Sequence, residues 1–198
     1  MKKFFTLVIV SLLSAVAVQA QKVVINKTDG SKVTFRADEI QSVQFAPASV
    51  VADQFVGSYK GTDKISVGGL FSYTSSEAVT YKVTANEDGT VNLTVPEETF
   101  KKTMMGNLTL SSYTISKIPY NESEKAFIKA YKDDNIKFHF IIKGDDGAVT
   151  SDKEYTFDSR ICKVTITKGA DGKLTVSNTY QMGKMPFPIS GTFIGTKQ

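Results

Sequence analysis

Apolar and polar residues alternate on both sides of an Asp-Gly pair in the segment Val164-Thr165-Ile166-Thr167-Lys168-Gly169-Ala170-Asp171-Gly172-Lys173-Leu174-Thr175-Val176. Alternation with a period of two is typical of a strand with one buried face. Asp-Gly adopts the positive φ angles that a tight hairpin turn requires. The same pair recurs at Asp29-Gly30, Asp88-Gly89 and Asp146-Gly147, again between alternating runs. Four such turns predict antiparallel pairing over most of the chain, and so an all-β protein.

Residues 1–20 have the pattern of a signal peptide for export. Lys2 and Lys3 precede an apolar run over residues 4–18, and Val18-Gln19-Ala20 places small or modest side chains where signal peptidase cleaves. A retained membrane anchor is the alternative, but the run is shorter than the roughly 20 apolar residues of a helical span. We therefore expect cleavage after Ala20, no membrane span in the mature protein, and a periplasmic or extracellular location.

A short β-hairpin module is expected over residues 21–46, followed by a linker over residues 47–54. Alternating segments before and after the Asp29-Gly30 turn form the two strands of the hairpin. Val43 and Phe45 are expected to end a third short strand. A unit of two or three strands is marginally stable alone, so this module is expected to dock on the main domain or on a protein partner.

The main domain is expected over residues 55–198, as an antiparallel up-and-down β-barrel of about eight strands. Each strand has one apolar and one polar face, and a barrel or a sandwich would bury the apolar faces. Short hairpins between consecutive strands favour the barrel. Alternating segments occur at 79–84, 91–95, 136–143, 162–167 and 173–180, and further strands are expected at 56–66, 108–118, 152–158 and 188–196.

Two stretches interrupt the alternation. Residues 96–106 read as a long connection that carries Met104 and Met105. Residues 121–134 are expected to be partly helical, because Asn121 has the side chain of a helix N-cap and Glu124 follows three residues later.

Several short motifs resemble those of known barrel proteins. The opening segment Phe55-Val56-Gly57-Ser58-Tyr59-Lys60-Gly61 is similar to the Gly-x-Trp motif that starts lipocalins, with Tyr59 at the Trp position. Two later regions resemble calycin-like secreted domains of gut anaerobic bacteria, and the leading hairpin resembles a module that follows signal peptides in the same bacteria. Those regions are Val95-Pro96-Glu97-Glu98-Thr99-Phe100 with Met105-Gly106-Asn107-Leu108-Thr109, and the closing segment 185–197. The resemblance implies an exported lipocalin-like barrel with a ligand cavity.

The residues that carry enzyme and metal chemistry are sparse. His139 is the only histidine, on the polar face of its strand, and Cys162 is the only cysteine, on an apolar face. One Cys and one His do not fill a structural zinc site, and no Asp-rich segment has the spacing of a calcium loop. The net charge is +4, without a basic cluster, so nucleic acid is not an expected partner. We expect no catalytic residue, no metal, no cofactor and no enzymatic activity.

An apolar set of residues is the candidate ligand site. Methionines are adaptable at binding surfaces, and inward aromatic and aliphatic side chains would line a barrel cavity. The set comprises Val79, Tyr81, Met104, Met105, Phe138, Phe140, Met182 and Met185. The sequence thus favours an exported, non-enzymatic barrel protein that binds a small hydrophobic ligand. The alternative is a structural or protein-interaction module with a solidly packed barrel, which would bind a protein partner through its surface or through residues 22–45.

Overall fold

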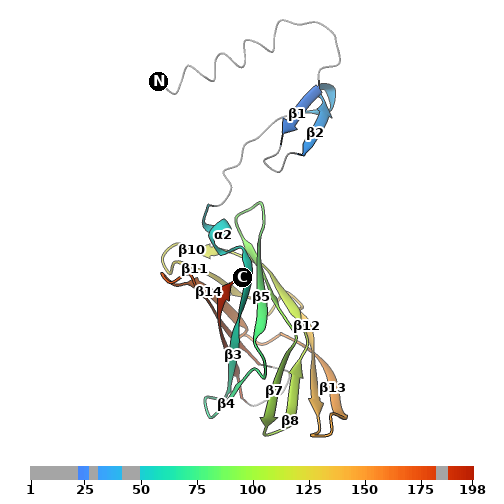
Figure 1. The fold of residues 1–198 in the computed structure, drawn as a ribbon, viewed down its shortest axis with the longest axis vertical. Helices are drawn as coiled ribbons and strands as arrows, with labels where there is room; N and C mark the ends of the chain where they lie inside the picture. Colours follow the sequence, from blue (N-terminus) through green and yellow to red (C-terminus); the bar gives the residue numbers. More distant parts are fainter. Residues whose placement is uncertain (1–21, 27–30, 42–49, 182–186) are drawn as a thin grey trace, which may run out of the picture. The chain divides into compact units, whose positions relative to one another are not determined.

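The computed structural model describes residues 22–26, 31–41, 50–181 and 187–198 (Figure 1). The chain divides into two compact units, with the boundary between Ala46 and Pro47. Among the described residues, no helix is long and apolar enough to cross a membrane.

The first unit is the expected hairpin. Strands β1 (Lys22–Asn26) and β2 (Lys32–Arg36) pair antiparallel, and a short helical turn, η1 (Ala37–Glu39), follows. Val23 lies opposite Phe35, and Ile25 lies opposite Val33, so one face of this ribbon is apolar. The third strand expected at Val43 and Phe45 lies outside the described residues.

The second unit begins with a short helix, α2 (Val50–Phe55), in a stretch that the sequence assigned to the linker. All later elements are strands, and all pairings are antiparallel. They are β3 (Gly57–Val67), β4 (Phe71–Thr74), β5 (Val79–Ala85), β6 (Val91–Val95), β7 (Glu98–Thr103), β8 (Gly106–Leu110), β9 (Tyr113–Ile118), β10 (Tyr120–Asn121), β11 (Ala126–Ala130), β12 (Lys137–Lys143), β13 (Val149–Thr156), β14 (Lys163–Lys168), β15 (Leu174–Tyr180) and β16 (Ile189–Lys197).

These strands form a nearly closed barrel from two sheets. The larger sheet runs β10-β11-β14-β15-β16-β3-β5-β6-β9, with β4 paired to β3, and the smaller runs β13-β12-β8-β7. Figure 1 labels β14, β3 and β5 of the larger sheet and β7, β8, β12 and β13 of the smaller one. The all-β antiparallel barrel expected from the sequence, with its preceding hairpin, is thereby confirmed.

The prediction that residues 121–134 are partly helical is wrong. The segment contains β10, a turn and β11, whose Phe127 pairs with Ile166 of β14 and is fully buried. The Asn121 side chain does accept backbone N–H bonds from Ser123 and Glu124, at 3.0 and 3.1 Å. The same Asn geometry serves helix caps and turns alike, and here it fixes a turn.

Residues 96–106 are not a long connection. They contain β7, which turns at Met104 and Met105 into β8. The polar residues of β7 and the absence of an Asp-Gly pair concealed this hairpin from the sequence pattern. Its register shifts between Phe100 and Thr103, and Lys102 adopts a positive φ of 55°.

Aromatic side chains fill the middle of the barrel. The rings of Phe138 and Phe157 stack with centroids 4.2 Å apart, and those of Tyr81 and Phe193 stack at 3.9 Å. All four side chains are buried. These two stacked pairs therefore occupy part of the interior that a continuous ligand cavity would need.

Candidate functional site

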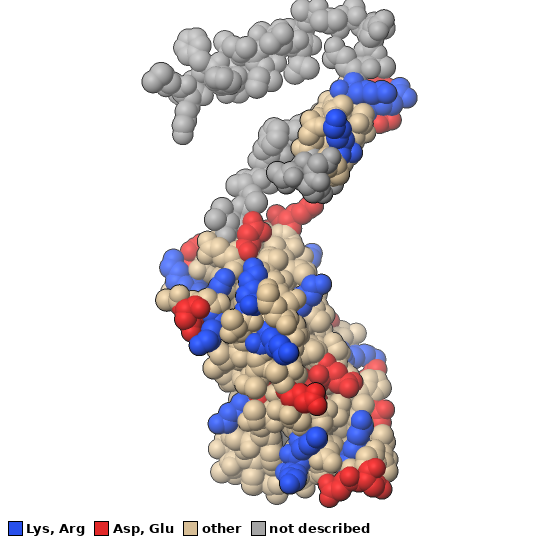
Figure 2. All heavy atoms as spheres, in the orientation of Figure 1, with Lys and Arg blue, Asp and Glu red and all other residues tan. Residues whose placement is uncertain are grey.

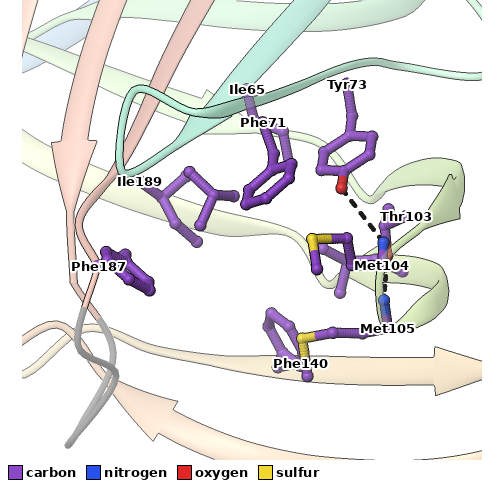
Figure 3. A pocket seen from close by; sticks show the side chains of 11 residues that line it. Ile65, Phe71, Tyr73, Thr103, Met104, Met105, Phe140, Phe187 and Ile189 are labelled. Atoms are coloured by element: carbon purple, nitrogen blue, oxygen red, sulfur yellow. Dashed lines mark hydrogen bonds between the residues drawn. The ribbon is translucent and has the colours of Figure 1, made fainter.

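An apolar pocket of about 220 Å³ lies at the end of the barrel where β4, β7 and β8 meet the start of β16 (Figure 3). Its residues come from β3, β4, the β7–β8 hairpin, β12 and the segment that enters β16. They are Ile65, Val67, Phe71, Tyr73, Thr103, Met104, Met105, Leu108, Phe140, Phe187 and Ile189. The pocket is half open, and Met104, with 73% of its surface exposed, stands at its rim.

Hydrogen bonds fix the methionine turn at the pocket mouth. The backbone N–H of Met104 donates to the Tyr73 hydroxyl at 3.2 Å, and that of Met105 donates to Oγ1 of Thr103 at 3.2 Å (Figure 3). Thr103 in turn donates to the carbonyl of Gly106 at 2.7 Å. The backbone of the turn is thus held, while the flexible Met side chains stay free to adjust to a ligand.

Among the described residues, no charged side chain lines this pocket, and its two polar side chains there, Tyr73 and Thr103, are engaged in those hydrogen bonds. Such a site favours the binding of an apolar molecule, because the apolar surfaces of both the molecule and the pocket are then removed from water. A charged group inside it would lose hydration without finding a counter-ion among the described lining residues.

The structure brings together only part of the set predicted from the sequence. Met104, Met105 and Phe140 line the pocket. Tyr81 and Phe138 lie in the packed interior, and Val79 borders a separate polar groove beside Glu97. The predicted Met182 and Met185 lie outside the described residues.

Several pocket residues were missed by the sequence analysis. Ile65 and Val67 continue the inward alternation of β3, Leu108 is an inward residue of β8, and Ile189 begins β16. Each follows the period-two pattern, so inward orientation was available from the sequence. The sequence did not show that these residues line one pocket, because that depends on which strand ends meet in the folded protein.

A second buried cluster is polar. Asp63 of β3 and Glu98 of β7 are only 4% and 3% exposed, and the Tyr81 hydroxyl donates to Oδ2 of Asp63 at 3.4 Å. Burial, followed by the charge of Asp63, raises the pKa of Glu98 to about 9. Burial also raises the pKa of Asp63. Oδ1 of Asp63 and Oε1 of Glu98 are buried without a hydrogen-bond donor, and no ion pair to either carboxyl occurs among the described residues.

His139 lies on the outer face of β12, as expected, but it has a partner that the sequence did not reveal. Its Nδ1 lies 2.8 Å from Oδ1 of Asp152 on β13, and both side chains are about half exposed. Ser111 is also adjacent, yet its Oγ accepts the backbone N–H of His139 at 2.7 Å rather than bonding the ring. The three residues therefore lack the Ser–ring contact of a hydrolase triad.

Cys162 is fully buried. Burial raises the pKa of its thiol, which keeps the sulfur in the unreactive protonated form. Within the described part of the chain, no group of three or more His, Cys, Asp or Glu side chains is arranged to hold a metal ion.

We predict that His139→Ala lowers the free energy of unfolding by about 1 kcal/mol at most, because exposed ion pairs contribute little. The isosteric Cys162→Val change is expected to leave a folded protein, since the buried thiol acts as a small apolar group. Urea unfolding of each variant measures both effects. A loss of several kcal/mol in the His139 variant would contradict the first expectation.

The surface charge is mixed on the face that Figure 2 shows. Lys and Arg side chains are spread over the second unit with Asp and Glu among them, and no large area of one sign stands out. This face offers no basic stripe of the kind that follows a nucleic acid backbone.

The fold agrees with the comparisons with known proteins. The sequence profile of the calycin-like β-barrel domain matches residues 55–196, and the chain therefore belongs to this family. A search of curated proteins finds no match.

Among solved structures, the fold is similar to a crystal structure of a "putative outer membrane protein" from Bacteroides fragilis. The TM-score is 0.50, with 17% sequence identity over 89% of this chain. The match spans 61% of the length of the Bacteroides protein. At this identity the likeness shows the fold alone.

Proposed function

We propose that this protein is an exported, non-enzymatic member of the calycin-like family that binds a small hydrophobic ligand in the pocket at the end of its barrel. The observation that carries the proposal is the pocket itself, which has a volume of about 220 Å³ and opens between Met104 and Met105 of the β7–β8 turn and Phe187. None of the described residues that line it is charged. Ligand sites are mostly apolar and concave, and the mouths of β-barrels are a common location.

The non-enzymatic part of the proposal is supported by where the reactive groups lie. His139 is on the outer face of β12, and the Cys162 thiol is buried and protonated. Neither Asp63 nor Glu98 lines the pocket. Among the described residues that line the pocket, a ligand would therefore meet no His, Cys, Asp or Glu side chain to act as nucleophile or general base.

The alternative function is a protein-interaction module, and the packed centre of the barrel favours it. The stacked pairs Phe138–Phe157 and Tyr81–Phe193 occupy space that a continuous ligand cavity would need. Ligand measurements decide between the two functions, because an interaction module would show no saturable uptake of apolar molecules.

We predict that the fluorescent apolar probe phenylnaphthylamine binds saturably, and that the double change Phe71→Ser with Met105→Ser weakens binding about tenfold. Both side chains line the pocket and stand partly exposed at its mouth, so the change removes apolar contact area worth about 1.4 kcal/mol or more. Fluorescence titration measures the affinity.

The matched control is Ile194→Ser, which removes an exposed apolar side chain of β16 that does not line the pocket. Its affinity for the probe should equal that of the unaltered protein. Absence of saturable binding, or equal losses in the pocket and control variants, would refute the ligand site.

The proposed export of the protein can be tested separately from ligand binding. Expressed in a Gram-negative host with a Sec pathway, the protein should accumulate outside the cytoplasm with Gln21 as its first residue, because Val18-Gln19-Ala20 forms the cleavage site. Intact-mass spectrometry of the exported fraction checks the N-terminus. A chain that keeps residues 1–20 would contradict the prediction.

A further inference from the structure

The smaller sheet meets the larger one at a seam beside the pocket. Strand β7 is the last strand of the smaller sheet, and among the described residues it pairs in a ladder with β8 alone. On its other side lie β4 and the connection from β4 to β5. An edge strand without a ladder is held by fewer bonds than an internal strand, so it can separate at lower cost.

The contacts that cross this seam in the described structure include the following three. The backbone N–H of Ser76 donates to the carbonyl of Thr99 at 2.8 Å. The N–H of Met104 donates to the Tyr73 hydroxyl at 3.2 Å. The third contact is between side chains, where Glu98 reaches from β7 into the interior and meets Asp63 of β3.

The contact between Asp63 and Glu98 needs a proton. Oδ1 of Asp63 and Oε1 of Glu98 are both buried acceptors without a donor. If both carboxyls were ionised, two negative charges would face each other in the core without an ion pair to any cation of the described residues. Such an arrangement is costly. A proton on one carboxyl removes one charge and supplies the missing donor. The raised pKa values of both groups agree with this state.

The other titratable groups that face the pair do not replace that proton. They are Tyr81 of β5, Tyr113 of β9 and Tyr180 of β15. Burial, the largest cause in each case, places their pKa values well above the usual value, so all three stay neutral. Loss of the carboxyl proton is therefore the charge change that this part of the interior undergoes first as pH rises.

We propose that the proton held between Asp63 and Glu98 fastens β7 to β3, and that its loss releases the β7–β8 hairpin and widens the pocket mouth. The hairpin carries Met104 and Met105 at its tip, so movement at the seam reaches the pocket directly. The irregular register near the tip and the positive φ of Lys102 show that the hairpin is not a uniform ladder. This inference rests on the proposed function in one respect, that the pocket is the ligand site.

The test follows the methyl resonances of Met104 and Met105 by NMR while pH is raised, in protein labelled at the methionine methyl groups. Met104→Leu and Met105→Leu samples assign the two resonances. We expect both to titrate with a midpoint near the Glu98 pKa of about 9. The titration at this midpoint should vanish in Glu98→Gln. All titration of the pair should vanish in the double variant Glu98→Gln with Asp63→Asn, which keeps the shape of both side chains without an ionisable group.

Two controls isolate the carboxyl pair. Glu97→Gln alters the exposed neighbour of Glu98 and should leave the titration unchanged. Ile194→Ser changes an exposed side chain of β16 that does not line the pocket, and it should preserve the midpoint. Methionine resonances that do not move through alkaline pH, or that move identically in Glu98→Gln, would overturn the proposal.

Binding of phenylnaphthylamine in the same samples separates this inference from the proposed function. If loss of the proton opens the seam, the dissociation rate of the bound probe should increase over the same pH range in the unaltered protein and not in Glu98→Gln. A methionine titration without probe binding at any pH would support the seam and refute the ligand site. Probe binding with pH-insensitive methionine resonances would refute the seam alone.

Discussion

At about pH 8, Glu98→Gln is expected to raise the free energy of unfolding by a few kcal/mol. Burial and the neighbouring Asp63 raise the pKa of Glu98 from its ordinary 4.5 to about 9 in the folded protein. Between these values the folded chain keeps a proton that the unfolded chain releases. The free energy of unfolding therefore falls as pH rises, by up to about 1.4 kcal/mol per pH unit for one such group.

The sign of this effect is opposite to that of a salt-bridged carboxylate. The contribution of Glu98 is fully present below pH 4.5 and is lost as pH approaches about 9. Glutamine stays neutral throughout this range. The free energy of unfolding of the variant should therefore exceed that of the unaltered protein most in mildly alkaline solution and only slightly in mildly acidic solution. The raised pKa of Asp63 acts in the same direction.

Urea unfolding of both proteins across this pH range measures the effect. Glu97→Gln, at the exposed neighbouring position, should follow the pH dependence of the unaltered protein. If Glu98→Gln also followed it, the proton would not reside on the buried pair.

The second large effect is expected from Gly61→Ala, which should destabilise the barrel by about 3 kcal/mol or more, or prevent folding. Gly61 lies where β3 pairs with β16, opposite Gly195. A Cβ atom at this position would lie 2.6 Å from the Cα of Gly195, and closer still to the Ile194 carbonyl oxygen. Both obstacles are backbone, so relief requires the strands to move apart.

A matched glycine in open space separates this clash from the general cost of replacing glycine. Gly147 has a φ of +81° and no atom within 4 Å of an added Cβ. Gly147→Ala should therefore cost only about 1–2 kcal/mol, from backbone strain. Urea unfolding compares the two variants, and equal losses would show that β3 and β16 separate readily at Gly61.

The strands of the barrel were largely predictable, because alternation and Asp-Gly turns act over a few residues. The hairpin of β14 and β15 follows directly from its sequence. The sequence-based predictions failed where one local pattern is compatible with two different structures. Asn121 can begin a helix or fix a turn, and pairing of Phe127 with Ile166, distant in the chain, decided for the strand.

The candidate pocket was predictable only in part. The adaptable pair Met104 and Met105 indicated one side of it, and the strand alternation oriented Leu108 and Ile189 inward. Nothing local indicated that Tyr81 and Phe138 would instead be enclosed by other aromatic rings. That result depends on how much space the two sheets leave between them.

The sequence by itself determined most of the strand segments, their inward faces and the Asp-Gly turns, because backbone conformation and alternation are properties of neighbouring residues. Tertiary structure decided which strand ends meet, where the interior stays open, and that Asp63 and Glu98 share one buried site. In the chain, β3 and β7 are separated by three other strands. Only closure of the barrel brings their carboxyl groups together and removes them from water, and burial then gives an ordinary glutamate a pKa of about 9.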